Sequence, residues 1–225
     1  MKKVLLVLLL AVILPIGQAG AAYWVIPTVN WDNWSSQVHF SDDADGKWHE
    51  AGLIDLTFYE SQSDYDNGKQ RLFSSSGFCI ELGQWATLGE ANTKSLTSYS
   101  SSSYGQTELY NAAWLINEFW SDTNNNYQNG ALQIAIWDTL YSGKTVSEIM
   151  DYGSPGTSHT EGYYNNYINA LNNSNYQGSG LEIVEFTNPN LQNIIKPVPL
   201  PATFLLMGLG LAGLTTARRK KIFNT

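Results

Sequence analysis

The chain has 225 residues, of which about 175 remain after two hydrophobic ends are set aside, enough for one domain with its own core. The segment 22–197 carries twenty acidic and six basic residues, a net charge of −14. This sign argues against nucleic acid as a partner, because phosphate groups require positive charge on the protein.

Residues 1–21 have the three parts of a secretory signal peptide. Lys2 and Lys3 precede an apolar run at 4–14, Pro15 interrupts it, and Ala19-Gly20-Ala21 forms a small-residue cleavage site. The apolar run is short and ends at a helix breaker, which disfavours a permanent anchor helix. We therefore expect the folded chain to begin at residue 22.

The segment 23–39 carries three tryptophans without a clean period, which predicts a strand or loop that covers the core. Residues 41–46 resemble the start of an acidic calcium loop. Ser41 stands at the first ligand position, however, and Gly52 stands where a bidentate Glu is needed. An Asp-Gly turn is the favoured interpretation.

A β-hairpin is predicted next. Residues 53–59 alternate, with Ile54, Leu56 and Phe58 on the apolar face, and residues 63–68 read as a turn. The chain returns from residue 71 into a second strand at 77–82, which places Cys79 and Glu81 on one face. Cys79 is the only cysteine, so in an exported protein it is buried, free, intermolecular or chemically used.

Three helices are predicted in the second half of the chain. A serine-rich loop at 98–105 leads to a helix at 108–120 that is capped by Thr107. A polar surface loop at 124–130 leads to a second helix at 129–143, and Thr160 precedes a third at 161–172. A strand at 181–186 closes the domain, so the fold class is α+β with antiparallel strands and a small cluster of helices.

The second helix carries Gln133 beside an apolar stripe formed by Leu132, Ile136 and Leu140. Trp137 follows Gln133 by one turn, so the carboxamide and the indole share a surface patch. A glutamine in this position is usually a core amide with satisfied hydrogen bonds. The alternative is a reacting group.

The three histidines show no spacing typical of a metal site, and we expect them to be solvated in loops. No cofactor is indicated. An enzyme built on Cys79 and His159, a cysteine hydrolase or transferase, would have to be assembled across the fold and remains an alternative.

Three motifs in order resemble the Cys-Gln thioester domains of bacterial surface adhesins. They are the Phe-Cys-Ile-Glu run at 78–81, the Ala-Ala-Trp-Leu-Ile-Asn run at 112–117 and the Gln-Ile-Ala-Ile-Trp run at 133–137, within a region of similarity at 53–145. The resemblance implies an internal thioester between Cys79 and Gln133, formed with release of ammonia. It also implies that Trp137 and Glu81 surround the bond, with Trp137 as a shield against water.

The C-terminal segment 198–221 resembles the PEP-CTERM anchors that exosortases process in Gram-negative bacteria. Val198, Pro199, Leu200 and Pro201 form the motif, an uncharged stretch at 200–217 is a marginal membrane span, and a basic cluster follows at 218–221. Leu200 replaces the usual Glu. Residues 200–203 also resemble a sortase signal, but Phe204 stands where that enzyme needs Gly, so exosortase ranks above sortase and sortase above a permanent anchor.

These observations predict an exported surface or matrix protein whose thioester couples once to an external nucleophile, rather than a turnover enzyme. The resemblance implies an amine as the target, and a polysaccharide hydroxyl is the other possibility. Eight tryptophans and thirteen tyrosines are also common in carbohydrate binders. A non-covalent matrix or carbohydrate-binding protein, in which Cys79 is merely buried, is therefore the main alternative.

Overall fold

The structure is a computed structural model that describes residues 22–28, 36–41, 46–84, 86–122, 125–151, 158–174 and 180–198. The predicted signal peptide, the predicted turn at 42–45 and the tail beyond Val198 lie outside these residues.

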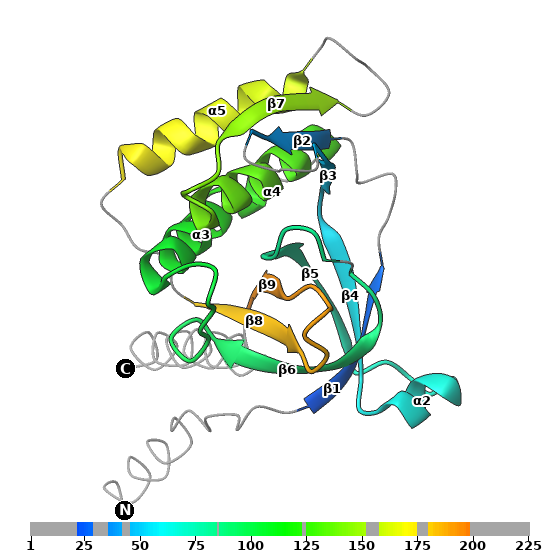
Figure 1. Cartoon of the computed structure of the whole chain (residues 1–225). Helices are drawn as coiled ribbons and strands as arrows, with labels where there is room; N and C mark the ends of the chain where they lie inside the picture. Colours follow the sequence, from blue (N-terminus) through cyan, green and yellow to red (C-terminus); the bar gives the residue numbers. More distant parts are fainter. Residues whose placement is uncertain are drawn as a thin grey trace, which may run out of the picture.

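Six antiparallel strands form a closed barrel in the order β1-β4-β5-β9-β8-β6, seen in the lower half of Figure 1. They are β1 (Ala22–Thr28), β4 (Ile54–Tyr59), β5 (Phe73–Cys79), β6 (Gly89–Ser95), β8 (Leu181–Phe186) and β9 (Ile194–Pro197). The predicted β4–β5 hairpin is confirmed, with Ile54 opposite Gly77 and Phe58 opposite Phe73. The predicted turn between them contains a short helix, α2 (Gln62–Asp66), capped by Ser61.

A second layer covers one side of the barrel and contains a sheet in the order β3-β2-β7 together with the main helices (Figure 1). Its strands are β2 (Ser36–Phe40), β3 (Trp48–Ala51) and β7 (Val146–Asp151), and its helices are α3 (Gln106–Phe119), η2 (Trp120–Asp122), α4 (Asn126–Leu140) and α5 (His159–Asn172). Helix α4 packs against α3, α5, β2 and β3, so it lies at the centre of this layer. The predicted α+β class is confirmed.

Several predicted boundaries are wrong because local contacts decide them. Gly105, not Thr107, is the N-cap of α3, and Thr107 lies inside the first turn. Ser158, not Thr160, caps α5 by accepting the Glu161 N–H. Helix α4 begins at Asn126 within the predicted surface loop, because the Asn125 side chain accepts the Gln128 N–H at 2.9 Å. The segment 23–39 supplies strands of both sheets instead of a cover over the core.

The core has two clusters, and α4 contributes to both. Leu132 and Ile136 pack with Phe78 and Ile80 between the barrel and the helices. Ile134 and Trp137 belong with Cys79 to the second cluster, here called the barrel cluster, which joins barrel strands to the β3-β2-β7 sheet. Residues 129–137 are therefore buried without a break, where the sequence predicted an apolar stripe on a single face. The strand predicted at 77–82 spans Phe73–Cys79 instead, so Leu82 lies beyond its end and packs against the cluster that contains Cys79.

A polar contact chain joins the elements of the helical layer. The Ser36 and Thr160 hydroxyls are 2.7 Å apart, and the Asp151 carboxylate accepts from the Thr160 hydroxyl at 2.7 Å and from the His159 N–H at 2.8 Å. Burial alone would raise the pKa of Asp151, but these hydrogen bonds outweigh it and hold that pKa below its usual value. These hydrogen bonds connect β2 and β7 to the start of α5.

Helix α4 approaches Ser36 so closely that only glycine fits at position 130. A Cβ there would lie 2.2 Å from the Ser36 hydroxyl oxygen. We expect Gly130→Ala to lower the free energy of unfolding by about 1–2 kcal/mol. The steric clash should destabilise the fold by more than the higher helix propensity of Ala stabilises it. Urea denaturation measures the free energy of unfolding of the variant and of wild type. Gly162→Ala in α5 is the matched control, because its Cβ meets no atom within 4 Å. The control should stabilise, and equal effects at both positions would contradict the close contact.

Acid should weaken the hydrogen bonds that the Asp151 carboxylate accepts, because it protonates that carboxylate. Because its pKa is lowered by folding, the stabilisation from its carboxylate is complete above the ordinary value of 3.8 and is lost as the pH falls below that value through the lower pKa of the folded protein. We expect Asp151→Asn to reduce the free energy of unfolding at neutral pH by about 1–3 kcal/mol. The variant should also lose less further stability than wild type between about pH 5 and pH 3 in urea denaturation. Asp66→Asn, at an exposed position in α2, is the control. Parallel acid profiles for wild type and Asp151→Asn would refute this role.

Candidate functional site

The structure brings Cys79 and Gln133 together at the point where β5 ends against α4. The Cys79 N–H donates to Gln133 Oε1 at 2.9 Å, and Gln133 Nε2 donates to the Cys79 carbonyl at 2.8 Å. Both residues are buried, with exposed fractions of 3% and 1%. Two residues that lie 54 positions apart in the chain therefore form one reciprocal pair, and the carboxamide lies directly against the residue that carries the sulfur.

This arrangement satisfies the carboxamide and also orients it. A buried amide needs partners for its oxygen and nitrogen, and the Cys79 backbone supplies one for each. An N–H aimed at a carbonyl oxygen also stabilises negative charge that develops on that oxygen during nucleophilic attack. The geometry is thus compatible with a structural amide and with an acyl group prepared for reaction.

The thiol of Cys79 lies in a dry environment. Burial, with a smaller effect from the nearby Glu81 carboxylate, raises the pKa of the Cys79 thiol well above its ordinary value. Because the thiolate is the reactive form, this thiol is a poor nucleophile toward external substrates in water. Its immediate neighbours in the barrel cluster include Ile134, Trp137 and Ile194.

Glu81 fixes the chain that follows Cys79. Its carboxylate accepts from the Asn193 N–H at 2.6 Å, from Asn193 Nδ2 at 2.8 Å and from the Tyr99 hydroxyl at 3.1 Å. Burial raises the pKa of Glu81, although these hydrogen bonds oppose the shift. The Ile80 N–H donates to the Asn193 carbonyl at 3.0 Å. Residues 80 and 81 are therefore joined to the segment that enters β9, which sets the position of Cys79.

Three tyrosines surround this segment, and the sequence analysis did not identify them. The Tyr141 hydroxyl donates to the Ile80 carbonyl at 3.2 Å and accepts from the Leu82 N–H at 3.3 Å. Tyr99 and Tyr104 are buried, although they lie in the segment predicted as a serine-rich loop. Burial raises the pKa of Tyr99 and of Tyr141 to about 12. For Tyr99 and Tyr104, the sequence offered one indication of burial, which is that both are aromatic residues within an otherwise polar loop.

Trp137 shares a core cluster with Cys79, and His49 contacts Trp137. Trp137 is 3% exposed and belongs to the same cluster as Cys79. The His49 ring meets the Trp137 ring edge-on, with centroids 6.3 Å apart. His49 is half-buried in β3, so its predicted place in a solvated loop is wrong. The Trp137 indole N–H is buried and has no hydrogen-bond partner within the described part of the chain.

His159 is engaged elsewhere. Its Nδ1 lies 3.0 Å from the Asp151 carboxylate, its ring lies 5.0 Å from that of Tyr127, and its side chain is 66% exposed. Cys79 is enclosed in the barrel cluster and pairs with Gln133. The structure therefore does not assemble the Cys79 and His159 pair of the enzyme alternative.

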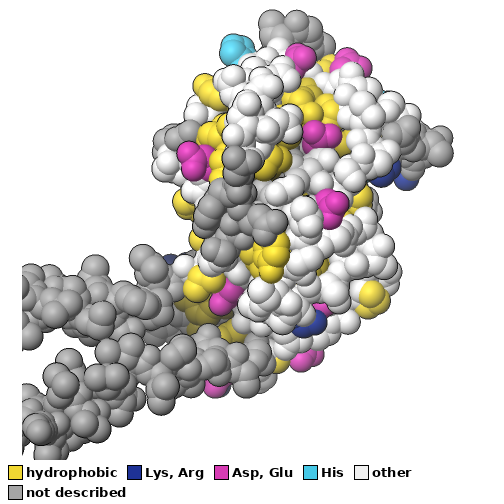
Figure 2. Space-filling model, turned by 90° about the vertical axis from the view of Figure 1, so that its left-hand side faces the viewer, with side chains coloured by type: hydrophobic (Ala, Val, Ile, Leu, Met, Phe, Trp, Pro, Cys, Tyr) yellow, Lys and Arg dark blue, Asp and Glu magenta, His cyan; other side chains and the backbone are white. Residues whose placement is uncertain are grey.

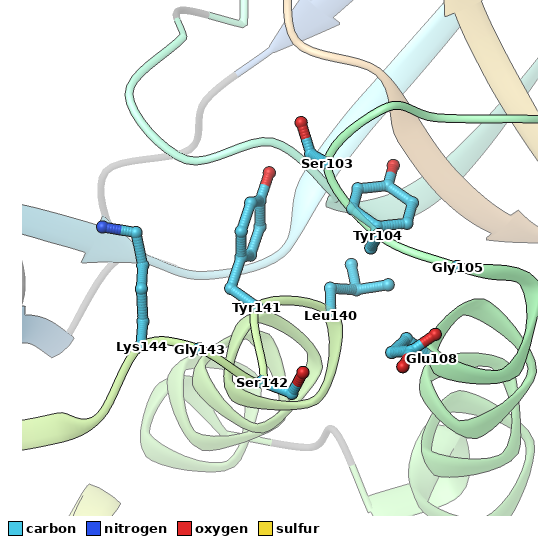
Figure 3. Close-up of a pocket in the computed structure, with 9 residues that line it drawn as sticks. All are labelled: Ser103, Tyr104, Gly105, Glu108, Leu140, Tyr141, Ser142, Gly143 and Lys144. Atoms are coloured by element: carbon cyan, nitrogen blue, oxygen red, sulfur yellow. The ribbon is translucent and has the colours of Figure 1, made fainter.

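Two cavities open near the end of α4. One, of about 220 Å³, is shown in Figure 3, where Tyr141 and Lys144 project in the same direction from the end of the helix. The other, of about 320 Å³, is lined by His49, Glu81 and Tyr141 among others. Ser103, Tyr141 and Lys144 line both. The second cavity is also lined by Glu81 and Leu82, which follow Cys79 in the chain.

Acidic side chains are spread over the face shown in Figure 2, and basic ones are sparse there.

Within the described ranges, no group of three or more His, Cys, Asp and Glu residues is placed to hold a metal ion. No helix among those residues is long and apolar enough to cross a membrane, and the predicted span at 200–217 lies outside them.

Comparison with known proteins identifies the tail. Residues 197–221 match the PEP-CTERM protein-sorting motif, which confirms the sorting signal predicted from the sequence. The motif indicates an exported protein anchored at the cell envelope of Gram-negative bacteria, and it implies an exosortase as the processing enzyme. It begins at Pro197, the last residue of β9. Val198 is exposed, and Pro199, Leu200 and Pro201 lie outside the described residues.

No curated protein matches the chain. Among solved structures, the chain is similar to the N-terminal thioester domain of a surface protein from Clostridium perfringens, with 12% identity and a TM-score of 0.43. The match covers 79% of this chain and 98% of that chain. A likeness at this TM-score assigns no chemistry, so the proposals below depend on the residues of the chain itself.

Proposed function

We propose that Cys79 and Gln133 form an internal thioester, through which this exported protein couples covalently to an external nucleophile. The observation that carries the proposal is the reciprocal hydrogen bonding between the Cys79 backbone and the Gln133 carboxamide in a buried site. Enforced proximity of this kind replaces a bimolecular encounter and lowers the barrier to reaction. The acceptor can be an amine or a hydroxyl.

Formation of the bond is balanced without a co-reactant. The Cys79 sulfur attacks the Gln133 carboxamide carbon, and the Cys79 N–H stabilises the charge that develops on Oε1. The carbon–nitrogen bond then breaks, the proton of the thiol passes to the departing nitrogen, and ammonia leaves. The acyl group becomes more electrophilic than the amide it replaces, and burial protects it from water until a partner arrives.

The protein would act once per molecule. Attack by the partner transfers the Gln133 acyl group to it and frees the Cys79 thiol, and nothing regenerates the thioester. This distinguishes the proposal from a turnover enzyme. The surroundings assigned to the bond are Trp137, which covers it, and Glu81, which fixes the chain after Cys79 through Asn193.

A non-covalent matrix protein is the second candidate, and one observation favours it. The Gln133 carboxamide already has partners for its oxygen and nitrogen, as a purely structural core amide would. In that case Cys79 stays a buried free thiol. The two candidates differ in covalent mass, so one measurement separates them.

We expect the domain, expressed as residues 22–197, to be lighter than the mass calculated from its sequence by one molecule of ammonia, measured by intact mass spectrometry of freshly purified native material. Cys79→Ala and Gln133→Ala should each restore the full mass, because either change removes one half of the bond. Gln128→Ala, five residues earlier on α4 and less buried, is the control and should keep the deficit. A full mass together with a titratable Cys79 thiol in native wild type would reject the thioester.

Processing of the tail follows from the confirmed sorting motif. In a host with its exosortase, we expect the exported protein to lose the apolar tail at or near residues 199–203. Deletion of residues 218–221 should impair processing, because the basic cluster holds the end of the chain on the cytoplasmic side. Peptide mapping of surface-exposed protein measures the new C-terminus. An intact tail in a processing-competent strain would make the segment a plain membrane anchor.

A further inference from the structure

The ends of the six barrel strands form two rims, and the chain leaves the domain at one of them. Neighbouring strands are all antiparallel, so each strand starts where its neighbours end. Strand β5 therefore runs from one rim at Phe73 to the other at Cys79, about 20 Å along the strand. We call the first the anchor rim, and its strand ends are Ala22, Tyr59, Phe73, Ser95, Leu181 and Pro197. The Cys79 and Gln133 pair lies at the opposite rim.

The predicted membrane span begins almost at the anchor rim. Pro197 ends β9, the confirmed sorting motif begins at the same residue, and the uncharged stretch begins at residue 200. Three residues of fully extended chain reach at most about 11 Å. A tail held in the membrane before processing therefore keeps the anchor rim within that distance of the lipid surface.

We propose that, before the tail is processed, the anchor rim lies against the membrane surface and that the connection between β4 and β5 contacts it through Tyr65, Arg71 and Leu72. The partner is the headgroup layer of anionic lipids. The opposite rim, with Cys79 and Gln133, then faces away from the membrane. This placement of the domain does not depend on the proposed thioester.

Exposed hydrophobic side chains gather at the anchor rim. Among the described residues, four large hydrophobic side chains are exposed, and three of them, Tyr65, Leu72 and Val198, lie at or just beyond this rim. Tyr65 in α2 is 39% exposed, and Leu72, which directly precedes β5, is 51% exposed. Figure 1 shows α2 projecting beyond the barrel on the side away from the helical layer. Tyrosine and leucine are side chains that enter the interface between lipid and water.

Backbone and ring contacts hold these side chains in place. The Leu72 N–H donates to the Phe58 carbonyl at 2.9 Å, which extends the pairing of β4 with β5. The Tyr65 ring meets the Tyr59 ring edge-on, with centroids 5.4 Å apart. Contact with lipid therefore requires little further ordering of the connection, and the entropic cost of binding is reduced accordingly.

Charge distinguishes the anchor rim from the rest of the domain. The four residues of each strand nearest this rim, together with the connection at 60–72, include four basic and four acidic residues. The remainder of the segment 22–197 therefore carries the whole net charge of −14. An anionic membrane repels that remainder and does not repel the neutral anchor rim. Electrostatics thus favours the same orientation of the domain as the attachment of the tail.

Arg71 is the basic side chain of the anchor rim that is available to a lipid phosphate. The other three are already in ion pairs, Lys69 with Asp64, Lys94 with Glu185 and Lys196 with Glu182. The Arg71 guanidinium is exposed and forms no ion pair within the part of the chain that the structure describes. A guanidinium offers paired N–H donors that match the oxygens of a phosphate group. Arg71 lies next to Leu72, so the two can contact the headgroup layer together.

The test measures how fast an exposed cysteine reacts with a membrane-impermeant maleimide. The protein is the exported full chain with its tail retained, from a strain without the exosortase, in nanodiscs of phosphatidylethanolamine and phosphatidylglycerol. Leu72→Cys reports on the anchor rim. Leu88→Cys is the matched control, since Leu88 is 45% exposed and directly precedes β6 at the opposite rim. Both are combined with Cys79→Ser, which keeps the backbone hydrogen bonds to Gln133 and removes the thioester from the measurement.

We expect Leu72→Cys to react about 10-fold or more slowly in nanodiscs than in detergent micelles, because burial at the interface excludes the reagent. Leu88→Cys should change by less than about threefold, because its rim faces water. Arg71→Gln should speed the reaction at position 72 in nanodiscs by about threefold or more, the contribution of one basic residue near an anionic surface. Lys47→Gln, which changes the same charge outside the anchor rim, should leave that reaction unchanged.

Equal rates at position 72 in nanodiscs and in micelles, or equal slowing at positions 72 and 88, would overturn the proposal. Slowing as large in phosphatidylcholine nanodiscs as in the anionic ones would also overturn it, because charge would then have no part in the contact. A full chain that does not enter nanodiscs would remove the tether on which the orientation depends. Protection of position 72 in micelles that grows with protein concentration would assign the rim to a contact between two copies of the chain. None of these results bears on the thioester, which the mass measurement tests separately.

Discussion

The reciprocal hydrogen bonds between Gln133 and Cys79 determine how the helical layer meets the barrel. Strand β5 ends at Cys79, and the N–H and carbonyl of that residue pair with a side chain of α4. Separation of the two layers would leave a buried amide and two backbone groups without partners, each of which costs about 1–3 kcal/mol. Helix α4 is therefore fixed against the end of β5, and the buried glutamine is compatible with the core only in this position.

Surrounding contacts hold the pair from the other side. Tyr141 bonds the backbone of Ile80 and Leu82, while Glu81 and Asn193 join the same segment to the start of β9. The pKa values of Cys79, Glu81 and Tyr99 are all raised, with burial as the first cause in each case. Cys79 and Gln133 themselves are only 3% and 1% exposed, so water has little access to the pair. Exclusion of water is the condition under which a thioester survives until its partner arrives.

The proposed bond would also add a covalent link at the place where the noncovalent contacts converge. It would close a loop of 54 residues, for which the chain-entropy treatment of disulfides gives a stabilisation of about 4 kcal/mol before strain is subtracted. The loop contains the whole of β6 and α3 and the first half of α4. The domain and its sorting signal are adjacent in the chain, because the PEP-CTERM motif begins at the last residue of β9.

Features that depend on a local pattern could be predicted from the sequence. The alternation of Ile54, Leu56 and Phe58 predicted β4, the 3.6-residue period predicted the helices, and the order of motif, apolar run and basic cluster predicted the sorting tail. Cys79 and Gln133 are indicated by the resemblance, and their roles remain a prediction.

Closure of the strands into a barrel could not be predicted in this way, and neither could the burial of Tyr99 and Tyr104 or the contact of His49 with Trp137. Strand β6 is polar and carries no apolar alternation, and it exists because β1 and β8 pair with it from opposite sides. Such pairing depends on residues distant in the chain, so no local period records it.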